Sequence, residues 1–352
     1  MPLATPKLAM SPSLVLLALV SSLALSCGPT TIEPVPDIPQ TVDYDTVKID
    51  YAGQDGVEQP QAGTLTGALV GESSGLAEFT RKTVFGTNEI MYGVFELIDR
   101  ITAYPARQPQ EGRWVWETPP RADDYLYLQI DAVDAETFSY SLRWGNSAQD
   151  NREIFSGWFT PFETADSPDD ARQDQQGEGL LYLDFDAFHA YDPTSFEGKM
   201  AIAFRARNGV RQVRVGFDQF TNGDNEPLNA IYRYVQLPSG RGRLVFFGRG
   251  DFGEDGEPHE FFSVDAAWLP DAQGRVAARI EGGTLSQPVV VRQCWDASET
   301  IVWEESQPTR PLHDGGSPDA CAATLRALTI DPPTYEPPNG RDPEVPEAHP
   351  SE

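Results

Sequence analysis

The chain has 352 residues, with 54 Asp and Glu against 26 Lys and Arg, so its formal net charge is −28. A nucleic-acid-binding protein needs clustered basic side chains to replace the counterions of its partner, and this balance excludes that class of function. The 18 Phe, 12 Tyr and 7 Trp residues supply enough apolar surface for a hydrophobic core. The composition therefore predicts an acidic, folded protein.

The amino terminus has the layout of an export signal. A positive start that includes Lys7 precedes a mostly apolar stretch from Ser13 to Leu25, which is too short for a stable membrane span and suits a secretory signal. We therefore expect residues 1–26 to be a signal peptide that is removed from the mature protein.

A cysteine, Cys27, directly follows this stretch. The run Leu23-Ala24-Leu25-Ser26-Cys27 resembles the lipobox of bacterial lipoproteins. The resemblance implies that Cys27 becomes the new amino terminus and carries lipid chains that anchor the protein durably. Gly28 follows instead of the Asp that retains lipoproteins at the inner membrane, which implies the outer membrane, with the protein facing the periplasm or the cell surface. The alternative is an ordinary signal peptide with a chance cysteine.

The two remaining cysteines, Cys294 and Cys321, form an even pair in an oxidising compartment, so we expect a disulfide between them. A metal site is the rival interpretation. Only His313 lies between them and neither belongs to a CxxC motif, which disfavours that site. We expect no metal and no cofactor.

Composition divides the mature chain into three parts. Residues 27–63 are rich in Pro and acidic side chains without sustained periodicity, which predicts a flexible tether behind the lipidated cysteine. Residues 331–352 predict a disordered acidic tail for the same reason. A single β-rich domain is expected over residues 64–330.

One segment has helical periodicity. Over residues 88–104 the apolar side chains recur with a period of 3.6 residues, with Asn88 or Thr87 as the expected cap and Pro105 as the stop. A stripe this apolar must pack against another element.

Twelve short segments with turn residues between them follow the helix. In residues 137–144, for example, Phe138 and Leu142 would face a core while Ser139 and Ser141 face solvent. The segments are 113–117, 124–130, 137–144, 153–159, 179–185, 199–206, 210–217, 229–237, 243–248, 260–268, 275–280 and 288–295. We therefore expect a mainly β (α+β) fold, a strongly curved antiparallel meander or partly closed barrel of about twelve strands, with the amphipathic helix packed on it.

Arginines lie in the middle of several expected strands. Arg143, Arg205, Arg214 and Arg233 would be costly on strands that face lipid. This position argues against strands that cross a bilayer.

Two short motifs carry weak chemical hypotheses. Gly71-Glu72-Ser73-Ser74-Gly75 fits the G-x-S-x-G pattern of serine esterases, but the segments around it lack the strand and helix alternation that this chemistry requires, so a Gly-Ser turn is favoured and an esterase using Ser73 is a remote alternative. We find no set of residues in the sequence that matches a known catalytic pattern, and we expect that the protein is not an enzyme.

Asp251 and Asp255 lie around glycine turns, as does Asp224, and such oxygen ligands suit calcium. Counted from Asp251 and from Asp218, the twelfth positions of the two loops hold Phe262 and Asn229 instead of the bidentate Glu of an EF-hand, so solvated acidic turns are the favoured interpretation.

The order of features resembles a group of predicted lipoproteins from Gram-negative bacteria. The residues that carry the likeness are LIDRITAYP (97–105), RWVWETP (113–119), FSGWFTP (155–161), LYLDFDAF (181–188), PLNAIYRYVQ (227–236), CWDAS (294–298) and DAC (319–321). The resemblance implies a compartment and a shape and no activity. In architecture alone, a sheet wrapped round a helix is also similar to LolA-type lipoprotein carriers.

These features favour a lipid-anchored extracytoplasmic binding module, with an apolar or lipid ligand or a partner's segment held between helix and sheet. The candidate apolar binding face is formed by Met91, Val94, Ile98, Trp114, Trp116, Trp144 and Trp158. The alternative is a structural or interaction lipoprotein in which these side chains fill the core and leave no small-molecule site.

Overall fold

The computed structural model describes residues 44–51, 69–119, 124–162, 176–193, 196–221, 227–250, 260–283, 285–309 and 314–326. All of them belong to one compact unit within residues 36–352. The expected signal peptide, Cys27 and the tail at 331–352 lie outside the described residues, as do Asp224, Asp251 and Asp255.

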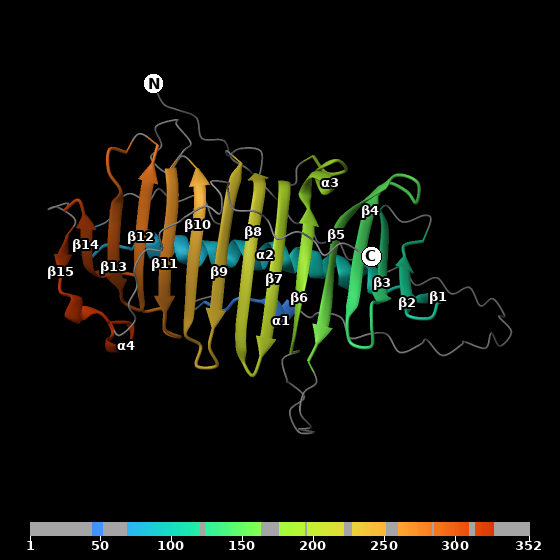
Figure 1. Cartoon of the computed structure of the whole chain (residues 1–352), viewed down its shortest axis with the longest axis horizontal. Coiled ribbons are helices and arrows are strands. Elements are labelled where there is room, and N and C mark those ends of the chain that lie inside the picture. The colour runs from blue at the N-terminus through green and yellow to red at the C-terminus, as the bar shows by residue number, and fades with distance from the viewer. Residues whose placement is uncertain are drawn as a thin grey trace, which may run out of the picture. The chain divides into compact units, whose positions relative to one another are not determined.

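The described strands form one antiparallel sheet in which neighbours in sequence are neighbours in space (Figure 1). Their bounds are β1 Arg107–Gln110, β2 Arg113–Glu117, β3 Tyr125–Ala132, β4 Phe138–Gly145, β5 Asn151–Pro161, β6 Gly177–Asp184, β7 Glu197–Arg207, β8 Val210–Thr221, β9 Leu228–Gln236, β10 Gly242–Gly250, β11 Glu260–Trp268, β12 Gly274–Gly282, β13 Val289–Trp295, β14 Ile301–Gln307 and β15 Gly315–Gly316. β1 and β15 are the two edges, so the sheet is open and does not close into a barrel. The predicted fold class, an antiparallel meander with an amphipathic helix packed on it, is confirmed.

The twelve predicted strands correspond to β2 through β13, and β1, β14 and β15 were not predicted. β1 contains Pro109 and is exposed at all four positions, so it carries no apolar alternation. In β14 the polar residues Glu304 and Ser306 are buried, which hides the strand's alternation from a hydropathy pattern. The strand predicted over 179–185 ends at Asp184, whose side chain caps the short helix α3 (Phe185–His189).

Helix α2 runs from Gly75 to Thr102 and crosses one face of the sheet (Figure 1). The prediction of a start at Asn88 or Thr87 was wrong, because the N-cap is Ser74, whose hydroxyl accepts a hydrogen bond from the Ala77 amide at 3.0 Å. The buried stripe of α2 includes the polar residues Thr80, Thr87 and Asn88, which interrupt its hydropathy signal. The predicted stop was close, because α2 ends three residues before Pro105.

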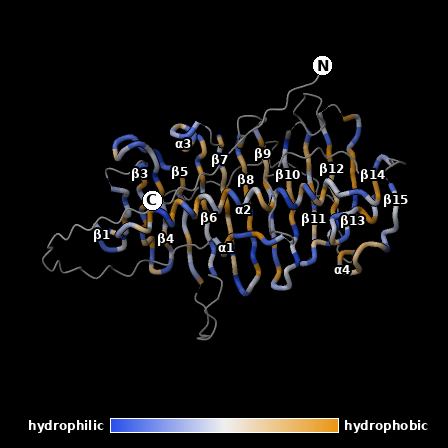
Figure 2. The backbone as a smooth tube through the Cα atoms, turned by 180° about the vertical axis from the view of Figure 1, so that it is seen from behind, coloured by the Kyte–Doolittle hydropathy of each residue, from blue (hydrophilic) through white to orange (hydrophobic). Residues whose placement is uncertain are grey.

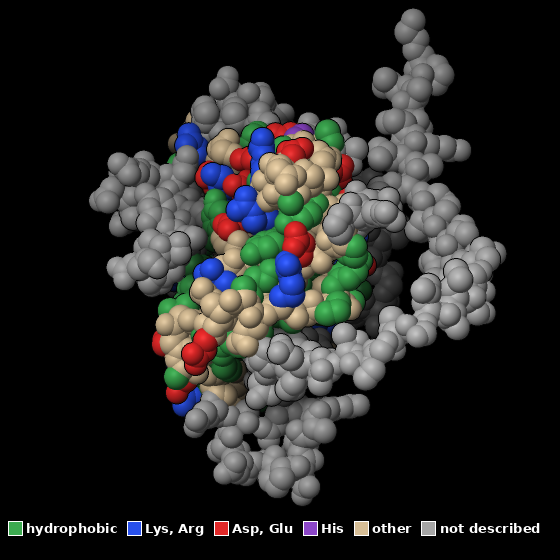
Figure 3. All heavy atoms as spheres, turned by 90° about the vertical axis from the view of Figure 1, so that its right-hand side faces the viewer, with side chains coloured by type: hydrophobic (Ala, Val, Ile, Leu, Met, Phe, Trp, Pro, Cys, Tyr) green, Lys and Arg blue, Asp and Glu red, His purple; other side chains and the backbone are tan. Residues whose placement is uncertain are grey.

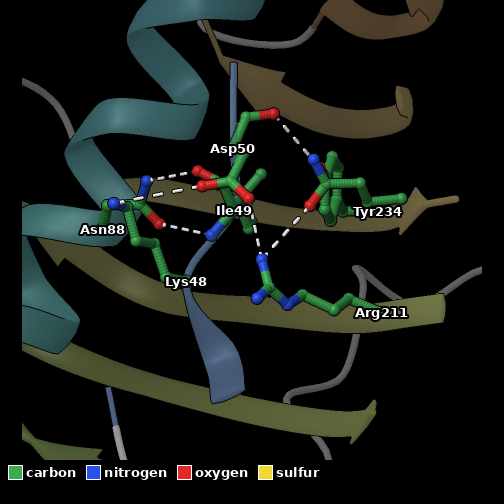
Figure 4. A network of polar contacts seen from close by, with 7 residues as sticks. Lys48, Ile49, Asp50, Asn88, Arg211 and Tyr234 are labelled. Carbon is green, nitrogen blue, oxygen red and sulfur yellow. Dashed lines mark hydrogen bonds and ion pairs between the residues drawn. The ribbon is translucent and has the colours of Figure 1, made fainter. Parts of the chain in front are cut away.

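Residues 44–51 belong to the packed body, although the sequence assigned them to a flexible tether. After α1 (Tyr44–Val47) the chain is extended, and the side chains of Val47, Ile49 and Tyr51 are buried. The Asn88 side chain accepts from the Ile49 amide at 2.9 Å and donates to its carbonyl at 2.7 Å, while Arg211 binds the Asp50 carboxylate at 2.7 Å (Figure 4). We call residues 44–51 the strap.

Residues 321–326 pack on the other side of the sheet. The sulfur atoms of Cys294 in β13 and Cys321 lie 2.02 Å apart, at disulfide distance. Beyond them, Leu325 of helix α4 (Ala323–Arg326) packs on Ala267 and Ala277. The C-terminal segment therefore covers part of β11 and β12 on the face away from α2.

Candidate functional site

The sheet has two faces, which we call the core face and the outer face. The core face packs against α2 and the strap. Hydrophobic and hydrophilic residues alternate along the strands, as expected for a sheet with one buried face (Figure 2). The outer face carries the other half of each strand's side chains, and α4 covers part of it at β11 and β12. A ligand surface on the sheet must be sought on one of these faces.

Most of the predicted apolar binding face lies together on the core face. Met91, Ile98, Trp114 and Trp116 are each less than a tenth exposed and belong to one hydrophobic cluster. Val94 and Trp144 pack against the same cluster. These six side chains thus belong to the core or pack against it, and the Trp144 ring also stacks on Phe188 of α3.

Trp158 is the exception and does not join them. It pairs in register with Ser139 of β4 and Leu180 of β6, which point away from α2. Its placement on the outer face separates it from the other tryptophans, and the alternation of β5 explains why, since Phe159 next to it belongs to the core cluster.

The outer face of β3 to β6 forms an open groove of about 1590 Å³. Its lining combines aromatic rings with hydrogen-bonding groups. The side chains that point from these strands and the neighbouring β2 into the groove include Arg113, Tyr125, Tyr127, Gln129, Asp131, Ser139, Ser141, Arg143, Glu153, Ser156, Trp158, Thr160, Glu178, Leu180 and Tyr182. Viewed from the β1 end, acidic and basic side chains are interspersed with hydrophobic ones (Figure 3).

A polar chain runs along β3 in the groove. The Tyr127 hydroxyl donates to Gln129 Oε1 at 3.1 Å, and the Gln129 amide donates to Asp131 Oδ2 at 2.6 Å. Asp131 in turn accepts from the Arg113 guanidinium. Residues at alternate positions of a strand share one face, and this period places the three β3 side chains in a line.

The other charged groups of the groove are also held in place. Ser141 donates to Glu153 Oε2 at 2.5 Å, and Arg143 Nε donates to Asn151 Oδ1 at 2.6 Å. These contacts fix donors and acceptors across β4 and β5. The groove therefore presents both kinds of hydrogen-bonding group in a preformed arrangement.

Tyr125 stands at the end of the groove that adjoins β2. Its hydroxyl donates to Glu117 Oε1 at 3.1 Å. Burial, helped by this hydrogen bond to a carboxylate, raises the pKa of Tyr125 to about 12. Tyr125 thus stays a neutral donor throughout the physiological range.

The motif around Ser73 does not form a nucleophile elbow. Ser73 is exposed and pairs as an isolated bridge with Thr300, beside β14. The described histidine, His189 in α3, contacts Glu197 at the start of β7. Seven strand spacings, about 34 Å, separate β7 from β14 in the sheet, so the structure does not bring His189 to Ser73. His259, His313 and His349 lie outside the described residues.

The described part of the chain contains no group of three or more His, Cys, Asp or Glu side chains arranged to hold a metal ion. None of the helices in that part combines the length and apolar character that a membrane span needs.

Tyr125, Tyr127 and Tyr182 were not among the ligand-binding residues predicted from the sequence. A signal was present in residues 124–130, where the tyrosines alternate with the buried Leu126 and Leu128. Aromatic residues at the solvent-facing positions of a strand indicate a candidate binding surface, because packing of the core requires aromatic residues only on the core face.

Comparisons of the chain with protein-family models, curated proteins and solved structures find no match.

Proposed function

We propose that the protein is a lipid-anchored extracytoplasmic binding module, and that its ligand is a polyhydroxylated molecule, a glycan, bound in the outer-face groove of β3 to β6. The observation that carries the proposal is the composition of the groove, where aromatic rings lie among preformed donors and acceptors. The apolar side chains of the core face are occupied in packing against α2, which favours the outer face over the helix–sheet interface as the ligand surface.

A glycan matches this surface in two ways. A sugar ring has an apolar C–H face that packs on an aromatic side chain, and Tyr127, Trp158 and Tyr182 offer such surfaces. Each sugar hydroxyl can both donate and accept a hydrogen bond. The groups around Gln129 and Asp131 together supply donors and acceptors for such hydroxyls. An open groove also admits a chain that continues beyond it at either end.

The test is binding of the full-length protein to a glycan microarray, with Tyr127→Ala and Tyr182→Ala as groove variants. Both side chains are half-buried on the outer face, so their loss should weaken binding at least about tenfold without unfolding the protein. Tyr92→Ala is the matched control, because Tyr92 is 57% exposed on α2, on the other side of the sheet.

Two results would contradict this function: no binding of the wild-type protein to any glycan, or glycan binding that is unchanged in Tyr127→Ala and Tyr182→Ala. The first result would favour the structural or interaction lipoprotein with a filled core. The anchor is tested separately: Cys27→Ala should abolish metabolic labelling with palmitate and move the protein from the membrane to the soluble fraction. Unchanged labelling would remove the lipid anchor from the proposal.

A further inference from the structure

Two arginines face each other across the centre of the sheet. Arg214 of β8 and Arg233 of β9 are directly opposite in register, on the outer face, and both are exposed. Directly opposed like charges repel each other in an antiparallel pair. Among the described residues neither guanidinium has an acidic partner, although the chain carries 54 carboxylate side chains.

The neighbouring arginines differ in this respect. Arg205 lies diagonal to Arg214 and is paired with Glu178 at 3.5 Å. Arg243 lies diagonal to Arg233 and is paired with Asp265. The flanking charges are therefore balanced locally, and Arg214 and Arg233 leave two uncompensated positive charges at the centre. Partial burial, together with the repulsion from Arg233, lowers the pKa of Arg214.

The arginines lie in line with the groove. Strand register places Trp158, Leu180, Ala203, Arg214 and Arg233 in one row across β5 to β9. Three strand spacings, about 14 Å, separate Trp158 from Arg214. The positions between them, Leu180 and Ala203, have no long polar side chain, so a molecule that lies in the groove and extends past β6 along this row can reach both guanidiniums.

We infer that Arg214 and Arg233 form a subsite for an anionic group, and that the ligand of the groove is an acidic glycan, one that carries carboxylate, sulfate or phosphate groups. The inference rests on the proposed function and names its substrate class. Two guanidiniums side by side offer planar, bidentate donors to such an oxyanion. The net charge of −28 does not oppose this locally, because charges beyond the Debye length of about 8 Å are screened at physiological salt.

The experiment uses a glycan microarray that contains acidic glycans together with their neutral parents. The full-length protein should bind the acidic member of a pair about tenfold more tightly than the neutral one. In Arg214→Gln/Arg233→Gln this preference should disappear while binding of the neutral parent remains. Arg241→Gln is the control, because it removes one positive charge from the turn before β10 and should leave the preference intact.

The outcomes separate the two proposals. Equal binding of acidic and neutral glycans, or a preference that survives the double substitution, would overturn the anionic subsite and leave the glycan-binding function in place. If the wild-type protein binds no glycan on the array, both the glycan-binding function and the anionic subsite are overturned. A second readout needs no glycan: inorganic phosphate should raise the melting temperature of the wild-type protein and not that of Arg214→Gln/Arg233→Gln, and equal shifts would count against the subsite.

Discussion

Single side chains of the outer face differ in what they contribute to stability. Arg243 and Asp265 face the outer side from β10 and β11, with two hydrogen bonds of 2.9 and 2.6 Å between them, and the Asp265 carboxylate is buried. Arg214 lies between Ala203 and Arg233 in register, so the charged residue opposite it is another arginine. The same residue type is thus stabilising at one position and unfavourable at the other.

Arg214→Gln should therefore raise the free energy of unfolding, by up to about 0.5 kcal/mol, because the substitution removes a like-charge pair. Arg243→Gln should lower it by about 2 kcal/mol, because the buried Asp265 carboxylate loses its charged donor. Urea denaturation of both variants measures the difference. A destabilised Arg214→Gln protein would show that the arginine contributes to the fold, and the argument for a ligand-binding role would then fail.

At the scale of elements, the strap and α2 depend on each other. Asn88 lies in the middle of α2 and provides both hydrogen-bonding partners for the buried backbone of Ile49 (Figure 4). Tyr51 adds aromatic contacts with Phe85 of α2 and Trp268 of β11. The strap thereby ties the helix to the sheet.

We expect Asn88→Ala to lower the free energy of unfolding by about 2 kcal/mol, because the Ile49 amide and carbonyl lose their partners in a buried site. Amide hydrogen exchange should accelerate more over residues 47–51 than in the strands of the sheet. The control is Glu89→Ala, an exposed neighbour on α2. If residues 47–51 exchange as slowly in Asn88→Ala as in the wild type, the strap is held by its apolar contacts alone.

The whole molecule should be sensitive to alkaline pH. Burial raises the pKa of three tyrosines in two parts of the fold, Tyr51 of the strap and Tyr232 and Tyr234 of β9. In the unfolded chain a tyrosine ionises near pH 10. Above that pH the unfolded state releases protons that the folded state retains, so stability is complete below pH 10 and falls as the pH rises beyond it.

Each of these tyrosines contributes a slope of up to about 1.4 kcal/mol per pH unit. Urea midpoints measured between pH 8 and pH 11.5 should be constant at first and then fall. In Tyr232→Phe, which keeps the ring and removes the hydroxyl, the fall should be shallower. A wild-type midpoint that does not change up to pH 11.5 would mean that these hydroxyls ionise without penalty.

The sheet could be predicted from the amino-acid pattern alone. Alternation with a period of two residues identified β2 to β13, and short connections made sequential antiparallel pairing the expected topology, because both signals are local. The pattern failed where buried residues are polar, as at Asn88 in α2 and Glu304 in β14, since their hydrogen-bond partners, Ile49 and Gln293, come from other elements.

Which residues become neighbours could not be predicted in this way, because it depends on how distant segments pack. The strap is held in place because the backbone of Ile49 hydrogen-bonds to the side chain of Asn88, 39 residues away. No feature of the sequence near either residue predicts that contact. Arg214 and Arg233 become neighbours, in line with Trp158, through strand register alone. A period of two fixes the face on which a side chain lies, and register across many strands fixes its neighbours, so the candidate site emerged only once the strands were paired.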